Sequence, residues 1–406
     1  MPHIINFRVS KLAGRKVDVS RILDRHVNVF WGLNGSGKTT LLKILHAALM
    51  NDADAVKELP FESAEVVIQT DDPRIILIRT ITKREPNRLE LGDAPGSNVI
   101  GEDALEDWIE QINATLEWSS SAHGNDIEGE PPIDPEDIDF MESFDHTYLP
   151  ITRITESRRR VYENADRRLN APLTTDDLFV RQVRQRWIDY SAKSLSAIRD
   201  IQQQGLATVL AILFGGAQGS VAPDAVSTTP EAAFDIVRTF LRQQRIALAV
   251  GRGDFMNRYR ASQDLQRVVE EIEDVRMEVE DVSRPQREFQ IVIDEMYTGN
   301  KHLTLGPLAQ TLARNSPPIR IMADDKFIPL KSLSSGEKQL LQILLEALAA
   351  ENNTVMIDEP ELSLHVDWQL QLVDSMRRVN PRCQLLLATH SSEVMADVAD
   401  DSVFRL

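Results

Sequence analysis

The sequence predicts an α/β fold with a mixed parallel and antiparallel sheet and a large, mainly helical insertion. Near the start of the chain, an apolar strand, a glycine-rich turn and a helix follow one another over residues 27–50. Two β-rich runs then flank the turn Asp71-Asp72-Pro73, which is typical of an antiparallel hairpin. After a middle region with helical periodicity, residues 319–406 return to short apolar strands and helices. Two α/β segments are therefore separated in sequence by a helical one.

The composition is that of a globular chain in a reducing compartment. Hydrophobic residues make up 42% of the 406 residues, enough for a sizeable core. The single cysteine, Cys383, excludes a disulfide framework. The first residues lack the charged and apolar regions of a secretory signal. The longest apolar run, around Leu206–Phe214, is far shorter than the ~20 residues of a membrane helix. We therefore predict a cytoplasmic protein without a membrane segment.

Charge is distributed unevenly along the chain. The net charge of −18 argues against a protein that coats nucleic acid over its whole surface. Residues 101–146 contain fifteen acidic residues and no Lys or Arg, whereas residues 151–200 contain eleven basic and seven acidic residues. Localised binding surfaces are one interpretation of this asymmetry, and ordinary solvated surface is the other.

Strands are predicted on both sides of the glycine-rich turn. Residues 3–10 and 15–23 read as strands ahead of it, and Val27–Trp31 reads as a short buried strand that leads into it. The hairpin after the following helix consists of Ala64–Thr70 and Arg74–Ile81. The sheet is therefore expected to have an antiparallel part.

Residues 32–39, Gly-Leu-Asn-Gly-Ser-Gly-Lys-Thr, fit the pattern of a phosphate loop, G-x-x-x-x-G-K-[ST]. Glycines let backbone N–H groups approach phosphate oxygens, and the N-terminus of the helix expected at Thr40–Met50 adds a favourable dipole. We predict a nucleoside triphosphate site in which Lys38 contacts the β- and γ-phosphates and Thr39 ligates Mg²⁺. The predicted nucleotide-binding residues are Gly32, Asn34, Gly35, Ser36, Gly37, Lys38, Thr39 and Thr40.

The middle of the chain predicts helices, an acidic loop and one returning strand. Residues 102–118 have an amphipathic helical pattern, and residues 119–146 have the composition of a flexible acidic loop. A strand is expected at residues 147–154.

Further helical patterns cover residues 157–211, 231–250 and 255–282, with a linker at 215–230. The last of these helices is predicted to stop before Pro285. Its heptad pattern persists for only a few turns, so long coiled-coil arms are not predicted.

Two later strands end in residues that can act on a triphosphate. Thr354–Glu359 is an apolar run that ends in two carboxylates, which the strand end would direct at the ligand crevice. Asp358 is predicted to hold Mg²⁺ through its hydration shell, and Glu359 to take a proton from the attacking water. The buried strand Gln384–Thr389 leads to His390, which is predicted to contact the γ-phosphate. An acidic turn and a structural histidine are the simpler alternatives.

A second anion site is predicted between these strands and the insertion. Ser334, Ser335, Gly336 and Glu337 stand at the start of a strongly apolar helix, Leu340–Ala350. The helix N-terminus can bind an anion, and Ser334 with Glu337 three residues later also fits a capping box. Both interpretations can hold together.

The order of these motifs resembles that of an ABC-type ATPase head. The phosphate loop is followed by Leu-Ser-Ser-Gly-Glu, by Met-Ile-Asp-Glu-Pro-Glu and by Ala-Thr-His. The run Glu-Pro-Glu-Leu-Ser-Leu-His at 359–365 is similar to RecF-like and OLD-like ATPases, an SMC-related, non-transporter group that includes ATPase subunits of bacterial anti-phage systems such as Septu and PARIS. His365 stands where transporter heads usually have Asp, and the signature reads Ser-Ser-Gly-Glu rather than Ser-Gly-Gly-Gln.

The resemblance implies an ATPase head made of residues 1–83 and 319–406, with residues 84–318 as the insertion. It also implies that two heads dimerise head to tail, so that each ATP lies between one phosphate loop and the signature of the partner. ATP would then stabilise the closed dimer by mass action. The implied catalytic residues are Lys38, Glu359 and His390, and the implied signature residues are Ser334, Ser335, Gly336 and Glu337. The usual Q-loop glutamine stays unassigned among Thr152, Arg153 and Gln69.

Two functions are compatible with such a head. The first is an ATPase, as a homodimer or a higher homo-oligomer, that controls a nucleic-acid-directed defence or repair complex through a separate effector, a nuclease or a toxin. The second is an ATP-bound scaffold with slow turnover, whose acidic block at 101–146 docks a basic, toxic partner. A transporter ATPase subunit is the least supported. Contact with DNA or RNA would involve an Arg-rich stretch. An exposed helix with scattered ion pairs is the alternative interpretation of the same residues. They are Arg153, Arg158, Arg159, Arg160, Arg167, Arg168, Arg181, Arg184 and Arg186.

Overall fold

The computed structural model describes residues 2–83, 116–124, 143–150, 174–214, 228–243, 249–297, 299–306 and 318–406. It divides into two compact units. The first unit contains Met1–Val183, Val292–Thr304 and Arg320–Leu406, and the second contains Arg184–Ile291 and Leu305–Ile319. Parallel and antiparallel sheets together with long helices confirm the predicted α/β class with a helical insertion.

An antiparallel sheet forms one layer of the first unit. Its strand order is β2-β1-β4-β5-β6. The predicted hairpin is confirmed, because β4 pairs with β5 in antiparallel register. The strands are β1 (His3–Ser10), β2 (Val19–Ile22), β4 (Ser63–Gln69), β5 (Ile75–Lys83) and β6 (Leu116–Gly124).

Strand β6 corrects two predictions from the sequence. Residues 116–118 belong to this strand rather than to a helix over 102–118, and residues 119–124 belong to it rather than to the acidic loop over 119–146. A run with three consecutive serines carries a weak strand signal, and pairing with β5 supplies the backbone partners that local composition does not reveal. Residues 102–115 and 125–142 lie outside the described part of the chain.

A parallel sheet forms the second layer and brings distant segments together. Its strand order is β13-β3-β12-β11-β7, and every pairing is parallel. All its strands therefore end at one edge, where ligands of open α/β sheets bind. The strands are β3 (Val27–Trp31), β7 (His146–Leu149), β11 (Thr354–Asp358), β12 (Gln384–Thr389) and β13 (Val403–Arg405). The predicted strand at 147–154 is described only up to Pro150, and β7 covers its first part.

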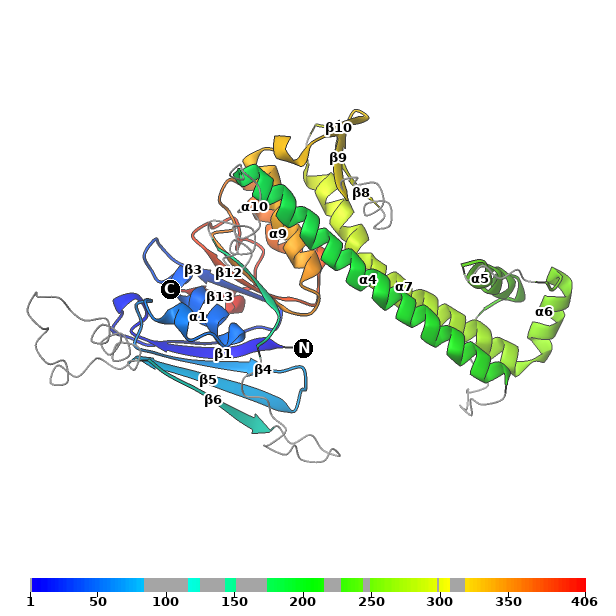
Figure 1. Cartoon of the computed structure of the whole chain (residues 1–406), viewed down its shortest axis with the longest axis horizontal. Helices are drawn as coiled ribbons and strands as arrows, with labels where there is room; N and C mark the ends of the chain where they lie inside the picture. Colours follow the sequence, from blue (N-terminus) through cyan, green and yellow to red (C-terminus); the bar gives the residue numbers. More distant parts are fainter. Residues whose placement is uncertain are drawn as a thin grey trace, which may run out of the picture. The chain divides into compact units, whose positions relative to one another are not determined.

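Helix α1 (Lys38–Met50) lies between the two sheets (Figure 1). Its side chains Leu41, Leu42, Ile44 and Leu45 are fully buried in one cluster with residues of both sheets. A helix that is apolar on most sides is suited to such a position, because each face removes apolar surface from water. The core thus holds fixed the helix whose N-terminus follows the phosphate loop.

Gln384, at the start of β12, links the two sheets. Its Oε1 accepts the backbone N–H of Ile4 at 3.0 Å and its Nε2 donates to the carbonyl of Ile4 at 2.8 Å. Ile4 lies where β1 departs from regular register with β4. The fully buried amide therefore satisfies both backbone groups of Ile4 at this irregularity.

Helices and a small sheet complete the first unit. Helices α9 (Ser335–Ala349) and α10 (Val366–Val379) pack together on the face of the parallel sheet away from α1 (Figure 1). Strands β8 (Lys301–Leu305), β9 (Ile319–Ala323) and β10 (Lys326–Ile328) form a three-stranded sheet. No helix among the described residues is long and apolar enough to span a bilayer.

Helices α4 (Thr175–Leu213) and α7 (Gln263–Met296), most of whose residues belong to the second unit, run side by side in opposite directions (Figure 1). The rings of Trp187 and Phe289 stack with centroids 6.5 Å apart, and Gly205 lies against Val275 farther along. Helices α5 (Pro230–Gln243) and α6 (Arg252–Ala261) share an apolar cluster with this pair, which includes Phe234, Phe255 and Val269. The heptad pattern predicted no long coiled-coil arms, whereas the structure pairs two helices of 39 and 34 residues.

Helix α7 also continues through Pro285, where the sequence predicted a stop. Proline in a helix interior costs about 3 kcal/mol because it removes one hydrogen bond and crowds the preceding turn. Phe289, Val292 and Ile293, beyond the proline, are fully buried. Their burial, at about 1.5–3 kcal/mol each, outweighs the local cost, which is a tertiary effect that periodicity does not report.

Candidate functional site

The phosphate loop joins β3 to α1 and leaves the start of that helix open. Gly37 is the N-cap, and its φ of 96° is a left-handed conformation that glycine adopts at low cost. No side chain caps the helix there, so its first N–H groups are directed at a ligand position. A cavity of about 300 Å³ lies against the loop and is lined also by Arg15 and Arg405. Open N–H groups and two guanidinium groups suit a bound polyphosphate.

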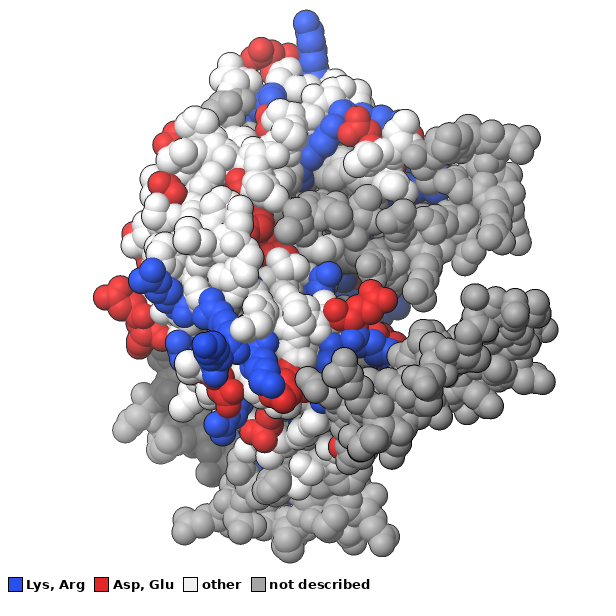
Figure 2. Space-filling model, turned by 90° about the vertical axis from the view of Figure 1, so that its left-hand side faces the viewer, with Lys and Arg blue, Asp and Glu red and all other residues white. Residues whose placement is uncertain are grey.

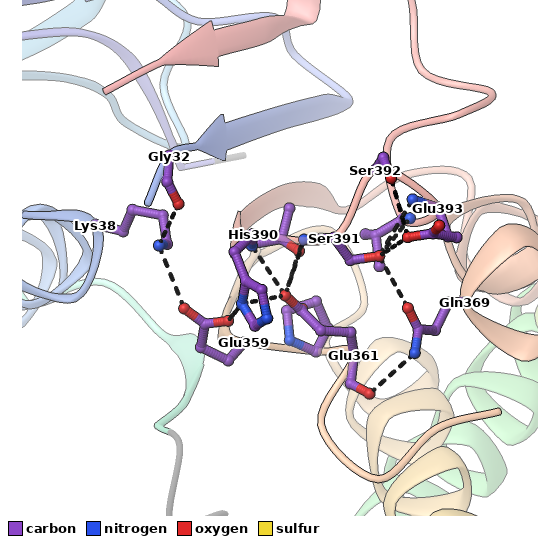
Figure 3. Close-up of polar contacts among 12 residues, drawn as sticks. Gly32, Lys38, Glu359, Glu361, Gln369, His390, Ser391, Ser392 and Glu393 are labelled. Carbon is purple, nitrogen blue, oxygen red and sulfur yellow. Dashed lines mark hydrogen bonds and ion pairs between the residues drawn. The ribbon is translucent and has the colours of Figure 1, made fainter. Parts of the chain in front are cut away.

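Lys38 is buried at the centre of this loop, with 4% of its surface exposed. Its Nζ donates to the carbonyl oxygens of Gly32 at 2.7 Å and Leu33 at 3.3 Å, and lies 3.4 Å from Glu359 Oε1 (Figure 3). A buried ammonium needs such partners because desolvation of an isolated charge is costly. The lysine thus contacts both the phosphate loop and the residue that follows β11.

Glu359 follows directly after β11 and turns back towards the loop. Its φ of 51° is left-handed, and its N–H donates to the carbonyl of Ala388 on β12 at 2.8 Å. The carboxylate reaches Lys38 with one oxygen and receives a hydrogen bond from His390 Nδ1 with the other (Figure 3). The structure therefore brings together Lys38, Glu359 and His390, the three residues that the sequence named as catalytic.

Opposing effects set the pKa of Glu359. Burial raises it, whereas hydrogen bonds with Glu361 and His390 and the charge of Lys38 lower it, and the net pKa lies below the ordinary value of 4.5. At neutral pH the carboxylate is therefore ionised, which is the state that accepts a proton from water.

The donor set at the loop fits Mg²⁺. Asp358 is fully buried at the end of β11, and Thr39 is in the first turn of α1. A carboxylate and a hydroxyl are hard oxygen ligands of the kind that Mg²⁺ prefers, usually together with waters and phosphate oxygens. When bound, the metal would stabilise the negative charge that develops on the phosphate. Thr39 and Asp358 are the residues that would hold it.

The signature residues Ser334–Glu337 start α9 with a complete capping box. Ser334 Oγ accepts the N–H of Glu337 at 3.3 Å, and Glu337 Oε2 accepts the N–H of Ser334 at 2.9 Å. A Cβ on Gly336 would lie 2.6 Å from the carbonyl oxygen of Ser363, so only glycine allows this close approach. The signature thus packs against the loop that follows Glu359.

Three residues of the predicted insertion also contact the start of α9: Tyr297, Lys301 and Asp176. Lys301 Nζ pairs with the Glu337 carboxylate, and the buried Tyr297 hydroxyl donates to the Glu337 carbonyl at 2.7 Å. Lys338, in the first turn of α9, pairs with Asp176 at 2.8 Å. Among the described residues, these contacts and the capping box are the polar partners of the signature, and no hydrogen bond or ion pair joins it to the phosphate loop.

The remaining predicted residues are placed as follows. Gln69 donates its side-chain amide to the carbonyls of Asp72 and Ile75 inside the β4–β5 turn, which is a structural role. Thr152 and Arg153, the other Q-loop candidates, lie outside the described residues. So do six of the nine arginines of the Arg-rich stretch, while Arg181, Arg184 and Arg186 are half-buried on α4.

Sequence reasoning assigned no role to Glu361, which belongs to the site. Its Oε1 lies 2.9 Å from His390 Nδ1, the nitrogen that also contacts the Glu359 carboxylate. The run Glu359-Pro360-Glu361 was visible in the sequence. Spacing alone does not show that a glutamate two residues beyond a strand end turns inwards to the next strand.

Two family models match the chain. The model AAA_23, described as "AAA domain", matches residues 3–209, and AAA_21, described as "AAA domain, putative AbiEii toxin, Type IV TA system", matches residues 242–396. A segment of 96 residues is 28% identical to the "Retron Vc95 probable ATPase" of Vibrio cholerae serotype O1 biovar El Tor. That segment spans 20% of this chain and 19% of the relative.

The solved structures that align with the chain include SMC heads. The Smc head domain of Pyrococcus furiosus, bound to the C-terminal domain of ScpA, aligns with a TM-score of 0.38 and 13% identity over 98% of this chain and 92% of that one. The SMC head domain of Thermotoga maritima aligns with a TM-score of 0.40 and 12% identity over 97% and 91%. Since the AAA_23 model covers just over half of the 406 residues, the chain belongs to this family of AAA-type ATPase domains.

Proposed function

We propose that the chain binds ATP with Mg²⁺ and hydrolyses it. The observation that carries this proposal is the meeting of Lys38, Glu359 and His390 at the ends of three adjacent parallel strands and the helix that follows. Lys38 and the N–H groups of α1 bind the phosphates, Glu359 takes a proton from the attacking water, and His390 contacts the terminal phosphate. Steady-state phosphate release with ATP and Mg²⁺ tests it, and a rate equal to that of the Lys38→Ala variant would refute it.

The contacts of Glu359 with Lys38 and His390 must change before ATP can be hydrolysed. Lys38 and His390, the groups that would receive the terminal phosphate, both contact the Glu359 carboxylate in this structure. Incoming phosphate must therefore take over these cations, and the carboxylate then becomes available to a water molecule. Hydrolysis is coupled in this way to a rearrangement that a bound nucleotide drives.

We also propose a head-to-tail dimer in which the signature acts on the partner's ATP. Among the described residues, no hydrogen bond or ion pair joins the signature to the phosphate loop of its own chain. Apolar side chains are exposed on both halves of the expected interface: Leu33 in the phosphate loop is 78% exposed, and Val366 and Leu370, after the 359–365 loop, are 51% and 40% exposed. A second copy would cover them.

Mixing two inactive variants tests this dimer. Lys38→Ala removes the phosphate-binding half of a site, and Ser334→Ala removes the signature half. In a mixed dimer one composite site keeps both halves, so an equimolar mixture should regain roughly a quarter of the wild-type rate, if subunits exchange at random. A mixture that stays as inactive as its components contradicts sharing of the site, whereas each variant alone reports on hydrolysis.

The biological role that we propose is control of a separate effector in a nucleic-acid-directed defence complex. The relative from a retron supports this role. Lys and Arg side chains gather in the lower part of one face, with acidic residues between them (Figure 2). Stimulation of the ATPase rate by DNA or RNA tests it. An unstimulated, slow rate would favour the scaffold that holds a toxic partner, for which the pairing of Glu359 with Lys38 is the supporting contact. In either case we place the protein in the cytoplasm, where its one cysteine, buried and free, stays reduced.

A further inference from the structure

Glu361 is a buried carboxylate in the loop that follows β11, and its side chain contacts the end of β12. It follows β11 by three residues, and 6% of its surface is exposed. Burying an ionised carboxylate is costly unless donors compensate for the lost water. Its partners therefore show what the protein gains from placing the charge there.

One oxygen of Glu361 accepts three hydrogen bonds from consecutive residues. Oε1 accepts the Thr389 hydroxyl at 2.6 Å, the His390 N–H at 2.9 Å and the Ser391 N–H at 3.2 Å (Figure 3). We call Thr389–Ser391 the His390 turn. Because the two N–H groups belong to the backbone, the carboxylate fixes the path of the chain that carries the histidine, and not only a side chain.

A second contact braces the same turn from α10. Gln369 accepts the Ser391 hydroxyl at 2.8 Å and donates to the carbonyl of Leu364 at 2.9 Å. The 359–365 loop and the His390 turn are thus tied together twice, by Glu361 and by Gln369 (Figure 3). A movement of one of them must carry the other.

One nitrogen of the His390 imidazole contacts two carboxylates. This nitrogen, Nδ1, contacts Glu359 and lies 2.9 Å from Glu361 Oε1. The backbone of the turn and the ring are therefore set by the same glutamate. Catalysis by positioned groups depends steeply on geometry, and a displacement of about 1 Å can cost about 100-fold in rate.

We propose that Glu361 is a positioning residue that fixes the His390 turn beside Glu359 and so controls the rate of phosphoryl transfer without contacting ATP. This inference rests on the proposed hydrolysis. A purely structural glutamate would instead lower the stability of the fold and leave the partition between kcat and KM unchanged.

Two substitutions at Glu361 separate these roles. Glu361→Ala removes all three accepted hydrogen bonds, and we expect kcat to fall at least about ten-fold with KM for ATP within about two-fold. Glu361→Gln keeps an oxygen for the three donors at nearly the same volume, and kcat should stay within about three-fold of wild type. Glu393→Ala is the matched control, since this carboxylate accepts the Ser392 hydroxyl at 3.1 Å and lies 2.8 Å from Ser391 Oγ, next to the His390 turn, but within the described part of the chain forms no hydrogen bond or ion pair with His390. Its kcat should equal that of wild type.

A double-mutant cycle shows whether Glu361 acts through His390 or through its own hydrogen bond with the Glu359 carboxylate. If it does, Glu361→Ala lowers kcat no further in a His390→Ala background, whereas independent effects multiply. Multiplying effects, or an Ala variant with wild-type kcat, would overturn the proposal. So would a Gln variant that is as slow as the Ala variant.

Hydrogen exchange of the backbone amides of His390 and Ser391 gives a readout that needs no turnover. Exchange of the His390 amide should quicken at least ten-fold in Glu361→Ala, and that of the Ser391 amide by less, because it also donates to Thr389 Oγ1 at 2.9 Å. Both amides should stay slow to exchange in Glu361→Gln and Glu393→Ala. If wild type does not hydrolyse ATP, the proposed function fails, while this measurement still decides whether Glu361 holds the turn. Unchanged exchange in the Ala variant would overturn that part as well.

Discussion

Helices α1 and α9 both begin at a glycine- and serine-rich segment, yet their N-termini are prepared differently. The start of α1 has no side-chain cap, whereas the start of α9 is closed by Ser334 and Glu337 of the same chain. The same backbone dipole is therefore open in the phosphate loop and satisfied in the signature. An open N-terminus can bind a phosphate directly. A capped N-terminus can bind a phosphate only if the capping hydroxyl or carboxylate gives up its hydrogen bonds. This suits a signature that would contact ATP only after the proposed dimer closes.

The largest effect should come from the open site. Lys38→Ala removes the only ammonium that reaches both Glu359 and the loop carbonyls among the described residues. We expect ATP to bind at least about 100-fold more weakly, since a charge-assisted contact contributes about 1.5–3 kcal/mol and more than one is lost. Titration calorimetry measures this. Lys43→Ala, an exposed lysine on the same helix, should bind as wild type does.

Glu359→Gln separates binding from chemistry at the same site. We expect ATP affinity to be retained and hydrolysis to fall at least about 100-fold, because an amide cannot accept the proton from water. With ATP the variant should accumulate as a dimer on size-exclusion chromatography. A variant that stays monomeric in saturating ATP would contradict the proposed dimer, and one that hydrolyses normally would remove Glu359 from its role.

At the capped site, Gly336→Ala should destabilise the fold. The added Cβ would lie 2.6 Å from the Ser363 carbonyl, and overpacking of this kind costs about 1–3 kcal/mol. Urea denaturation gives the change in the free energy of unfolding. Gly253→Ala in α6 is the control, because its Cβ would meet nothing within 4 Å and helix propensity would raise stability by about 0.5–1 kcal/mol. Equal losses in both variants would show that the close approach is not rigid.

Ser334→Ala tests the cap itself. Loss of an N-cap hydroxyl typically costs about 1 kcal/mol of stability, and Ser335→Ala, one residue farther on and not a cap, should cost less. Both variants are compared by the same denaturation. If Ser334→Ala were neutral, the capping box would contribute nothing, and α9 would resemble α1 more closely than the structure indicates.

The smallest expected effect is on how the free energy of unfolding depends on pH. Burial raises the pKa of Glu337, but hydrogen bonds from Lys301 and Ser334 outweigh it, so the pKa of this carboxyl lies below its ordinary value of 4.5. A depressed folded-state pKa contributes stability above the unfolded-state value, and that stability is lost as pH falls through the folded-state value. Stability measured from pH 5 to pH 3 should therefore fall more in wild type than in Glu337→Gln. Parallel curves would contradict the pairing with Lys301.

Short sequence motifs were enough to name candidate site residues that the structure brings together, because such motifs depend on few neighbours. Lys38 and Glu359 were recognisable from a strand, a turn and a helix, and the parallel pairing of β3, β12 and β11 places them together. Long-range packing was not recognisable in the same way. The continuation of α7 through Pro285 depends on residues buried far along the chain, and β6 depends on its partner β5. The role of Glu361 depends on a turn that belongs to another strand.

The order of the parallel sheet also dictates when it can form during synthesis. Strand β3, which carries the phosphate loop, has β12 and β13 as its two neighbours, and both come from residues 384–405. More than 350 residues thus emerge from the ribosome before this strand finds a partner in its sheet, because β3 ends at Trp31. Until β12 has been translated, only α1 or a chaperone can shield the apolar faces of β3 from water. A nascent chain stalled before β12 should consequently be sensitive to protease at the phosphate loop, even though its ATP-binding motif has long been translated.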